Sequence, residues 1–287
     1  MTFMRRVRYA FETVAAYLIY GFFWLLPVSA ASDLGGFLMR HIGPRMGITR
    51  VARKNLELAF PEKPAAQLQL IIIGMWDNLG RVIAEYPHLR KIWSRVELVG
   101  AEHLVVARES GKPAIFFGGH LANWEVNVLA AKMNGLDIHL VYRKPNNPGV
   151  DGLLRHARNA GAVGHIRKGP QGARDILSVI RDNGAVGMLV DQRLKEGVAA
   201  PFFGREAMTA TVMAPFVFKY GCPLYPSRSE RLGGARFRVT IYPPLKVPDT
   251  GDRNADTLKL MTDVNKLLES WIRERPEQWL WIHKRWG

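Results

Sequence analysis

The stretch AIFFGGHLANWEV, residues 114–126, decides how the centre of this chain should fold. The apolar run AIFF at its start predicts a β-strand, which the glycine pair ends just before the histidine. The two glycines that follow free the backbone to turn. Residues 126–133 have the composition and apolar spacing of a helix. We therefore expect a strand, a turn that carries a histidine, and a helix, in that order.

His120 and Glu125, separated by four residues, are the candidate catalytic pair of this stretch. Five steps along a helix rotate a side chain by about 500°, so the two residues do not share a helical face. They can meet only if His120 lies on the turn and Glu125 on the first turns of the helix. The imidazole would then act as a general base, and the carboxylate would stabilise the imidazolium that forms. The alternative interpretation is a buried, hydrogen-bonded histidine with an unrelated surface glutamate.

Segments typical of strands and helices alternate along the rest of the chain, which predicts an α/β fold. The expected fold is a central, mostly parallel or mixed sheet flanked by helices, with an N-terminal membrane helix and a helical N-terminal region. The expected strands are 97–99, 113–117, 138–142, 163–166, 185–190, 224–230 and 236–242, the last two forming a hairpin. The expected helices outside the motif are 51–60, 65–90, 149–160, 170–183, 209–220 and 252–274.

A run of 19 residues without a charge, at 13–31, predicts an uncleaved membrane anchor near the amino terminus. At 1.5 Å per residue such a helix would be about 28 Å long, close to the thickness of a bilayer core. Pro27 argues against one long uninterrupted helix. A cleaved signal peptide and a helix that lies in the membrane interface are the alternatives. The chain is accordingly divided into an anchor, 1–35, and a single α/β domain, 36–287.

The basic composition and the single cysteine restrict the partners and the compartment. The formal net charge is +15, which favours anionic lipid or an acidic carrier protein. Nucleic acid is not expected, because the sequence has no zinc-finger, RNP or helix-turn-helix pattern. Cys222 cannot form an internal disulfide; we interpret it as a buried, inert thiol in a reducing compartment rather than as an acyl-carrying nucleophile. No metal site is expected, because the histidines do not have the spacing of metal ligands.

Charged and polar residues follow three of the expected strands, where α/β folds tend to bind ligands. They are Arg143 after 138–142, Arg167 and Lys168 after 163–166, and Asp191, Gln192 and Arg193 after 185–190. The cations are candidates for binding phosphate groups of a substrate, and ordinary surface charges are the alternative. Asp191 is a candidate for anchoring a loop, pairing with an arginine or contacting substrate, with a helix-capping or turn aspartate as the alternative.

The block GGHLANWE resembles the H-x4-D/E motif of glycerolipid-type acyltransferases. Four further segments resemble, in order and spacing, the bacterial lipid A biosynthesis acyltransferases, which are the lauroyl/myristoyl transferase family. These segments are YRKPNNP (142–148), IRKGPQGARDIL (166–177), LVDQRLKEGVAAPFFG (189–204) and PEQWLWIHKRWG (276–287). The resemblance covers nearly the whole chain. It implies that His120 and Glu125 are the catalytic pair and that Asp191 supports the site.

The resemblance also implies a reaction. An acyl group would move from an acyl carrier protein thioester to a hydroxyl of a lipid A precursor, without a cofactor. The enzyme would be held at the cell inner membrane, single-pass or monotopic, with its active site facing the cytoplasm. Backbone N–H groups near Gly118, Gly119 or the helix at 126–133 are candidates for stabilising the oxyanion. The alternatives are an acyltransferase for another lipid, such as a lysophospholipid, glycolipid or ornithine lipid, and a non-catalytic membrane protein that binds lipid.

Overall fold

The computed structural model describes residues 3–286, and its centre is a seven-stranded sheet with the strand order β1-β9-β8-β2-β5-β3-β4. The strands are β1 (Val96–Val99), β2 (Ala114–Gly118), β3 (Ile138–Tyr142), β4 (Gly164–Arg167), β5 (Ala185–Leu189), β8 (Leu224–Gly233) and β9 (Arg236–Ile241). Neighbouring strands are parallel, except that β8 and β9 form an antiparallel hairpin. The prediction of an α/β fold with a mostly parallel sheet is confirmed.

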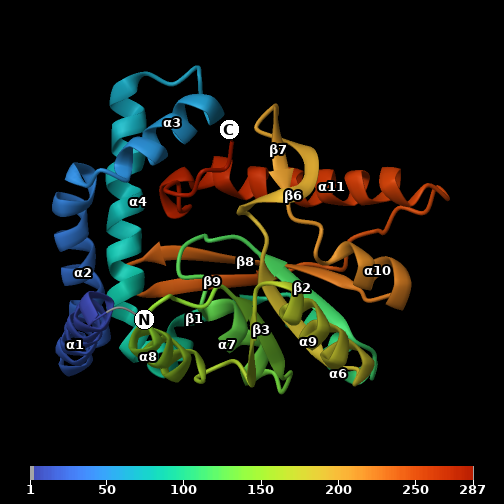
Figure 1. The fold of residues 1–287 in the computed structure, drawn as a ribbon, viewed down its shortest axis with the longest axis horizontal. Helices are drawn as coiled ribbons and strands as arrows, with labels where there is room; N and C mark the ends of the chain where they lie inside the picture. The colour runs from blue at the N-terminus through green and yellow to red at the C-terminus, as the bar shows by residue number, and fades with distance from the viewer. Residues whose placement is uncertain (1–2, 287) are drawn as a thin grey trace.

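The two faces of β2 contribute to two hydrophobic cores, as expected for a buried strand whose side chains alternate. The helices around the sheet are α6 (Ala101–Glu109), α7 (Val126–Met133), α8 (Pro148–Arg158), α9 (Pro170–Arg181), α10 (Ala214–Tyr220) and α11 (Arg253–Glu274). Ile115 and Phe117 belong to a core with residues of α9, α10 and α11, whereas Ala114 and Phe116 belong to a core with residues of α6, α7 and α8. Figure 1 shows α11 on one side of the sheet and α6 and α7 on the other.

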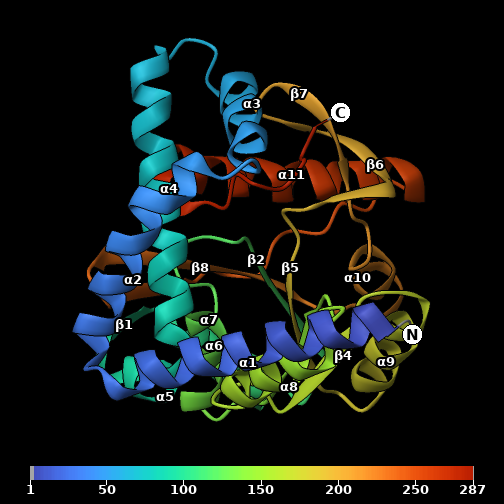
Figure 2. The ribbon, with the colours of Figure 1, turned by 60° about the vertical axis from the view of Figure 1, so that its left-hand side comes forward.

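The amino-terminal region is helical, as expected, and packs against the α/β unit. Its helices are α1 (Phe3–Leu25), α2 (Val28–Ile42), α3 (Thr49–Ala59), α4 (Ala65–Glu85) and α5 (Leu89–Ile92). α2 and α4 cross closely at two glycines, because a Cβ atom on Gly35 would lie only 2.5 Å from the carbonyl oxygen of Gly80. α1 lies along α8 (Figure 2), and the Thr13 hydroxyl donates to Oδ1 of Asn147, the residue that caps α8.

The expected membrane-spanning anchor finds no support in this fold. Pro27 divides the uncharged run at 13–31 between α1 and α2, and the first turns of α1 carry Arg5, Arg6 and Arg8. Across residues 3–286, no helix combines the length and the apolar character needed to cross a bilayer. The division into an anchor and a domain remains a prediction.

A separate antiparallel pair, β6 (Arg193–Phe202) and β7 (Arg205–Thr209), was not predicted from the sequence pattern. The hairpin lies beside α11 (Figure 1), and Phe202 stacks on Trp286 with ring centroids 5.6 Å apart. Polar and apolar residues do not alternate regularly along β6, so the sequence gives no period-two signal there. The helix expected at 209–220 is shorter and begins only at Ala214.

Candidate active site

The turn that joins β2 to α7 carries His120, as the sequence predicts, and the carboxy-terminal tail holds this turn in place. The N–H of Leu280 donates to the carbonyl oxygen of His120 at 3.1 Å, and Leu121 forms an antiparallel bridge with Trp279. Ala122 has a φ of 49°, a left-handed conformation that is unfavourable for a residue with a side chain. The turn therefore depends on contacts with the tail to keep this conformation.

Asp191 reaches the His120 ring from the neighbouring strand. β2 and β5 run parallel, so the residues that follow them meet at the same edge of the sheet. Nδ1 of His120 lies 2.8 Å from Oδ1 of Asp191, and the backbone N–H of His120 donates to Oδ2 of the same carboxylate at 2.8 Å. The indole N–H of Trp279 donates to Oδ2 at 2.7 Å.

The charge on Asp191 defines which nitrogen of His120 is available. Burial of the carboxylate opposes ionisation. The His120 ring and the hydrogen bonds that Asp191 accepts from His120 and Trp279 nevertheless hold the pKa of Asp191 well below its usual range. An ionised Asp191 keeps the proton of a neutral His120 ring on Nδ1. Nε2 of His120 then carries a lone pair and can accept a proton from a substrate hydroxyl.

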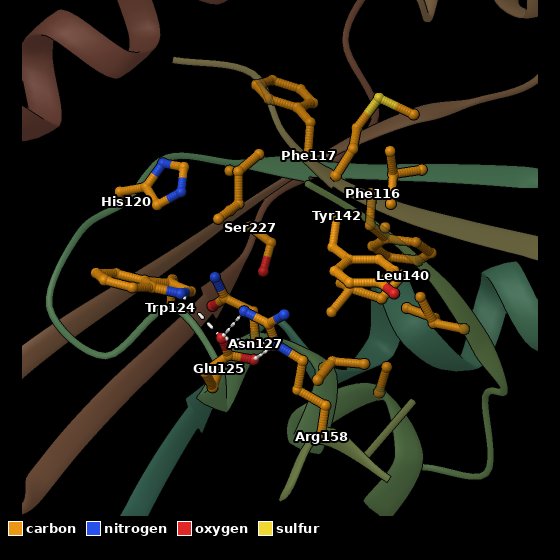
Figure 3. Close-up of a pocket in the computed structure, with 18 of the residues that line it drawn as sticks. Phe116, Phe117, His120, Trp124, Glu125, Asn127, Leu140, Tyr142, Arg158 and Ser227 are labelled. Atoms are coloured by element: carbon orange, nitrogen blue, oxygen red, sulfur yellow. Dashed lines mark hydrogen bonds and ion pairs between the residues drawn. The ribbon is translucent and has the colours of Figure 1, made fainter. Parts of the chain in front are cut away.

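Glu125 belongs to a different, buried cluster (Figure 3). Arg158 of α8 donates to its carboxylate from Nε at 3.0 Å and from Nη2 at 2.7 Å. The hydroxyl of Tyr86 donates at 2.6 Å and the indole N–H of Trp124 at 3.0 Å. Burial would raise the pKa of Glu125, but Arg158 and these hydrogen bonds lower it. Glu125 is thus a buried anion whose charge is fully paired.

The expected pairing of His120 with Glu125 is therefore replaced by two separate pairs. His120 points toward the end of β5 and is oriented by Asp191, for which the sequence implied only a supporting place in the site. Glu125 directly precedes α7 and points toward α8, where Arg158 binds it. Sequence spacing alone could not distinguish these partners, because both lie on other elements of the fold.

A cavity of about 180 Å³ opens beside His120. Figure 3 shows His120, Trp124 and Glu125 on one side of the cavity and Phe116 and Leu140 on the other. Its apolar lining comes from α6, α7 and four strands, β2, β3, β5 and β9, and includes Leu104, Phe116, Phe117, Val128, Ala131, Ile138, Leu140, Val141, Met188, Leu189 and Ile241. A mostly apolar cavity with a few polar groups suits an apolar chain that carries a polar reacting group.

The residues predicted to bind substrate are only partly brought together. Arg143, Lys168 and Gln192 line the cavity. The side chains of Arg143 and Lys168 are also exposed, so their charges are available to a ligand that enters from solvent. Arg167 and Arg193 do not line the cavity: Arg167 ends β4 with an exposed side chain, and Arg193 begins β6.

Cys222 lies outside the cavity lining and is inert as a nucleophile. Cys222 is buried, and burial raises the pKa of its thiol to about 11, so the thiol is protonated near neutral pH. Among residues 3–286, no three His, Cys, Asp or Glu side chains gather into a group that could hold a metal ion.

Four residues of the site were not predicted as functional from the sequence. Tyr86 and Arg158 surround Glu125, Trp279 binds Asp191, and His283 lies beside His120 with ring centroids 5.4 Å apart. Trp279 and His283 belong to the block 276–287, whose aromatic and basic residues are conspicuous in the sequence. No local pattern indicates that this block returns to the strand ends of the sheet.

Comparison with known proteins identifies the family of this chain. The family model for bacterial lipid A biosynthesis acyltransferases matches residues 1–287. A lipid A biosynthesis acyltransferase of Haemophilus influenzae is 26% identical over 91% of this chain and 85% of its own length. The lipid A biosynthesis palmitoleoyltransferase of Escherichia coli is 27% identical over 82% of this chain and 77% of its own length, and the lauroyltransferase of the same organism is 25% identical over 88% and 82%. The chain belongs to the bacterial lipid A biosynthesis acyltransferase family.

Proposed function

We propose that this protein transfers a fatty acyl chain from an acyl carrier protein thioester to a hydroxyl of a lipid A precursor. The observation that carries the proposal is a His120–Asp191 pair at an apolar cavity. The pair supplies a general base, and the cavity can hold the hydrocarbon chain of the donor. The similar proteins are lipid A biosynthesis acyltransferases, which supports the choice of acceptor.

In the proposed reaction, Nε2 of His120 accepts the proton of the acceptor hydroxyl as its oxygen attacks the thioester carbonyl carbon. Asp191 stabilises the imidazolium through the hydrogen bond to Nδ1. A C–O bond forms, and the carbonyl electron pair moves onto oxygen. When that pair returns, the C–S bond breaks and the thiolate takes the proton from His120. The products are an ester and a free pantetheine thiol, and His120 is neutral again.

Glu125 has an indirect role in this proposal. Its carboxylate is 2% exposed and bound by Arg158, so it is not free to take a proton from substrate. Both residues line the cavity. We therefore assign them to shaping the wall of the acyl site and fixing the start of α7, and we assign the stabilisation of the imidazolium to Asp191.

The positive charge of the chain supports an acidic acyl carrier protein as the donor. Arg143 and Lys168 are exposed at the cavity and could bind the phosphate of a phosphopantetheine arm or of the lipid acceptor. The net charge of +15 favours association with an acidic carrier protein and with anionic lipid.

We further propose that α1 lies in the surface of the membrane. Large apolar residues are exposed along this helix: Phe3, Met4, Val7, Phe11, Val14, Tyr17, Leu18, Ile19, Phe22, Trp24 and Leu25. Many of them recur at intervals of three or four residues, which is typical of an apolar helical face. Basic residues near the start of α1 would meet anionic headgroups.

The test is an acyl-transfer assay with the purified protein in lipid vesicles. Radiolabelled acyl carrier protein thioester and a Kdo-bearing lipid A precursor are supplied, and mass spectrometry identifies the product. His120→Ala should lose at least about 100-fold in turnover. His156→Ala, which changes an exposed histidine on α8, is the matched control and should keep the wild-type rate.

Three outcomes would overturn the proposal or its mechanism. Transfer to a lysophospholipid, a glycolipid or an ornithine lipid but not to the lipid A precursor would identify another acceptor. Binding of lipid without transfer to any of these acceptors would indicate a non-catalytic lipid-binding protein. An active, folded His120→Ala variant would remove His120 from the mechanism.

A further inference from the structure

Gln192 lies between two imidazole rings of the site. Its Nε2 is 3.0 Å from Nε2 of His283 and 3.4 Å from Nε2 of His120. His283 belongs to the same carboxy-terminal tail that contacts the turn of His120 through Leu280. The amide is therefore held by a segment far away in the chain.

The partners of the two rings define how the amide is oriented. Asp191 holds the proton of His120 on Nδ1, so the Nε2 that faces Gln192 has a lone pair. A lone pair needs a donor, and the NH₂ group is the donor of a glutamine amide. The same NH₂ group is closer to Nε2 of His283, which must then also be an acceptor. Burial and the nearby His120 lower the pKa of His283 to about 4, consistent with a neutral ring that has its proton on Nδ1.

We propose that Gln192 donates a hydrogen bond to the oxyanion during acyl transfer and that His283 is the residue that positions it. The inference rests on the proposed acyltransferase function. When an acceptor hydroxyl binds at Nε2 of His120, it replaces the long 3.4 Å contact with Gln192. The 3.0 Å bond to His283 remains and keeps the amide in place.

The N–H that is released lies beside the reacting atoms. As the hydroxyl oxygen forms the new C–O bond, the carbonyl electron pair of the thioester moves onto its oxygen. The N–H of Gln192 stabilises that negative charge until the pair returns and the C–S bond breaks. Gln192 neither gains nor loses a proton, because the proton of the hydroxyl passes to His120 and then to the thiolate.

Backbone donors of the turn are largely engaged elsewhere. The N–H of His120 donates to Asp191, that of Leu121 to the carbonyl oxygen of Gly119, and that of Ala122 to the carbonyl oxygen of Gln278. These three groups are thus not available to an oxyanion while the turn keeps its conformation. A side-chain amide in contact with Nε2 of His120 is better placed to serve as the donor.

The inference is tested by a double-mutant cycle in the vesicle assay. Gln192→Met keeps the length of the side chain without its N–H groups and should lower kcat about 100-fold with little change in KM. His283→Leu removes the acceptor and should lower kcat about 10-fold. Because His283 acts through the amide, adding His283→Leu to Gln192→Met should change kcat by less than about twofold. His283→Gln offers an acceptor oxygen and should restore most of the rate lost in His283→Leu. His156→Leu is the matched control.

Each alternative result is informative. Equal losses from His283→Leu in the wild-type and Gln192→Met backgrounds would show that His283 acts on its own, and a Gln192→Met variant with nearly normal kcat would exclude the oxyanion role. A wild-type protein that transfers no acyl group would overturn the proposed function instead. In that case the arrangement is still tested by ¹⁵N spectra of histidine-labelled protein near pH 8. We expect Nε2 of both His120 and His283 without a proton and a changed His283 signal in Gln192→Met; a protonated Nε2 on His283 would overturn the inference.

Discussion

Nδ1 of His120 lies 2.8 Å from Oδ1 of Asp191, although the two residues are 71 positions apart in the chain. The parallel pairing of β2 with β5 creates this proximity, because each residue follows the end of one of the two strands. The proposed general base and the carboxylate that pairs with it are thus held by the register of the sheet rather than by a shared helix.

Replacing Asp191 by Asn should slow acyl transfer by at least about 100-fold without unfolding the protein. An amide that presents its NH₂ group to Nδ1 forces the ring proton onto Nε2, where it blocks the uptake of the substrate proton. The measurement is the initial rate at saturating donor, compared with Asp182→Asn at the exposed end of α9. A rate within about threefold of wild type would show that Asp191 does not orient the base.

Replacing Arg158 by Met should destabilise the fold by about 3 kcal/mol, because it leaves the buried Glu125 charge unpaired. Adding Glu125→Gln to this variant should recover most of the loss. Urea unfolding of the single and double variants measures both effects. Lys132→Met, which breaks an exposed ion pair with Asp137, is the control and should cost less than about 1 kcal/mol. Additive losses for Glu125 and Arg158 would contradict their coupling.

Replacing Ala131 by Phe should shift the donor preference toward shorter acyl chains. Ala131 is buried on α7 and lines the cavity of about 180 Å³, so a larger side chain would occupy part of the space available to a hydrocarbon chain. Relative kcat/KM values for a series of acyl carrier protein thioesters measure the preference. Ala130, also buried on α7 but outside the cavity lining, supplies the control Ala130→Val. An unchanged preference with Ala131→Phe would show that the chain binds elsewhere.

His283 should make the stability of the protein fall as the pH falls from about 6.5 to about 4, because its pKa is about 4 in the fold against an ordinary 6.5. In this interval the unfolded chain binds a proton that the folded protein does not. The free energy of unfolding therefore rises with pH, and the part that depends on His283 reaches its full value only above about pH 6.5. His283→Gln removes the titration and should flatten this part of the curve. Urea unfolding at several pH values measures the free energy of unfolding of the variant and of the wild type. His88 and His165 also have lowered pKa values, but both proteins contain them, so their effect cancels in the difference. Parallel curves would mean that His283 titrates normally in the fold.

The local pattern of the sequence was sufficient for β2, for the turn with His120 and for the α/β class. A continuous apolar run of four residues is too short for a typical helix, and the two glycines that follow it indicate a turn. Asp191 and Gln192 were also predicted as site residues, because they follow an expected strand and parallel strands bring their carboxyl ends together.

The remaining features depend on contacts between distant segments. Glu125 is drawn to Arg158 by a charge on another helix, which its spacing from His120 does not reveal. His283 enters the site only because the tail pairs with the turn at Leu121 and His120. The uncharged run at 13–31 satisfied the length expected of a membrane span, but Pro27 divides it between two helices.

The pairing of the turn with the tail has a consequence for the order in which the enzyme is made. Leu280, which binds the carbonyl oxygen of His120, is synthesised about 160 residues later. During translation the residues of the sheet strands and of the apolar cavity are therefore all synthesised before the turn of His120 can form its contacts with the tail. Ala122 then lacks the hydrogen bond from its N–H to the carbonyl oxygen of Gln278, one of the contacts that hold its left-handed backbone, so the turn is not yet fully fixed. If the proposed reaction is right, the nascent chain should transfer no acyl group until the tail has emerged from the ribosome.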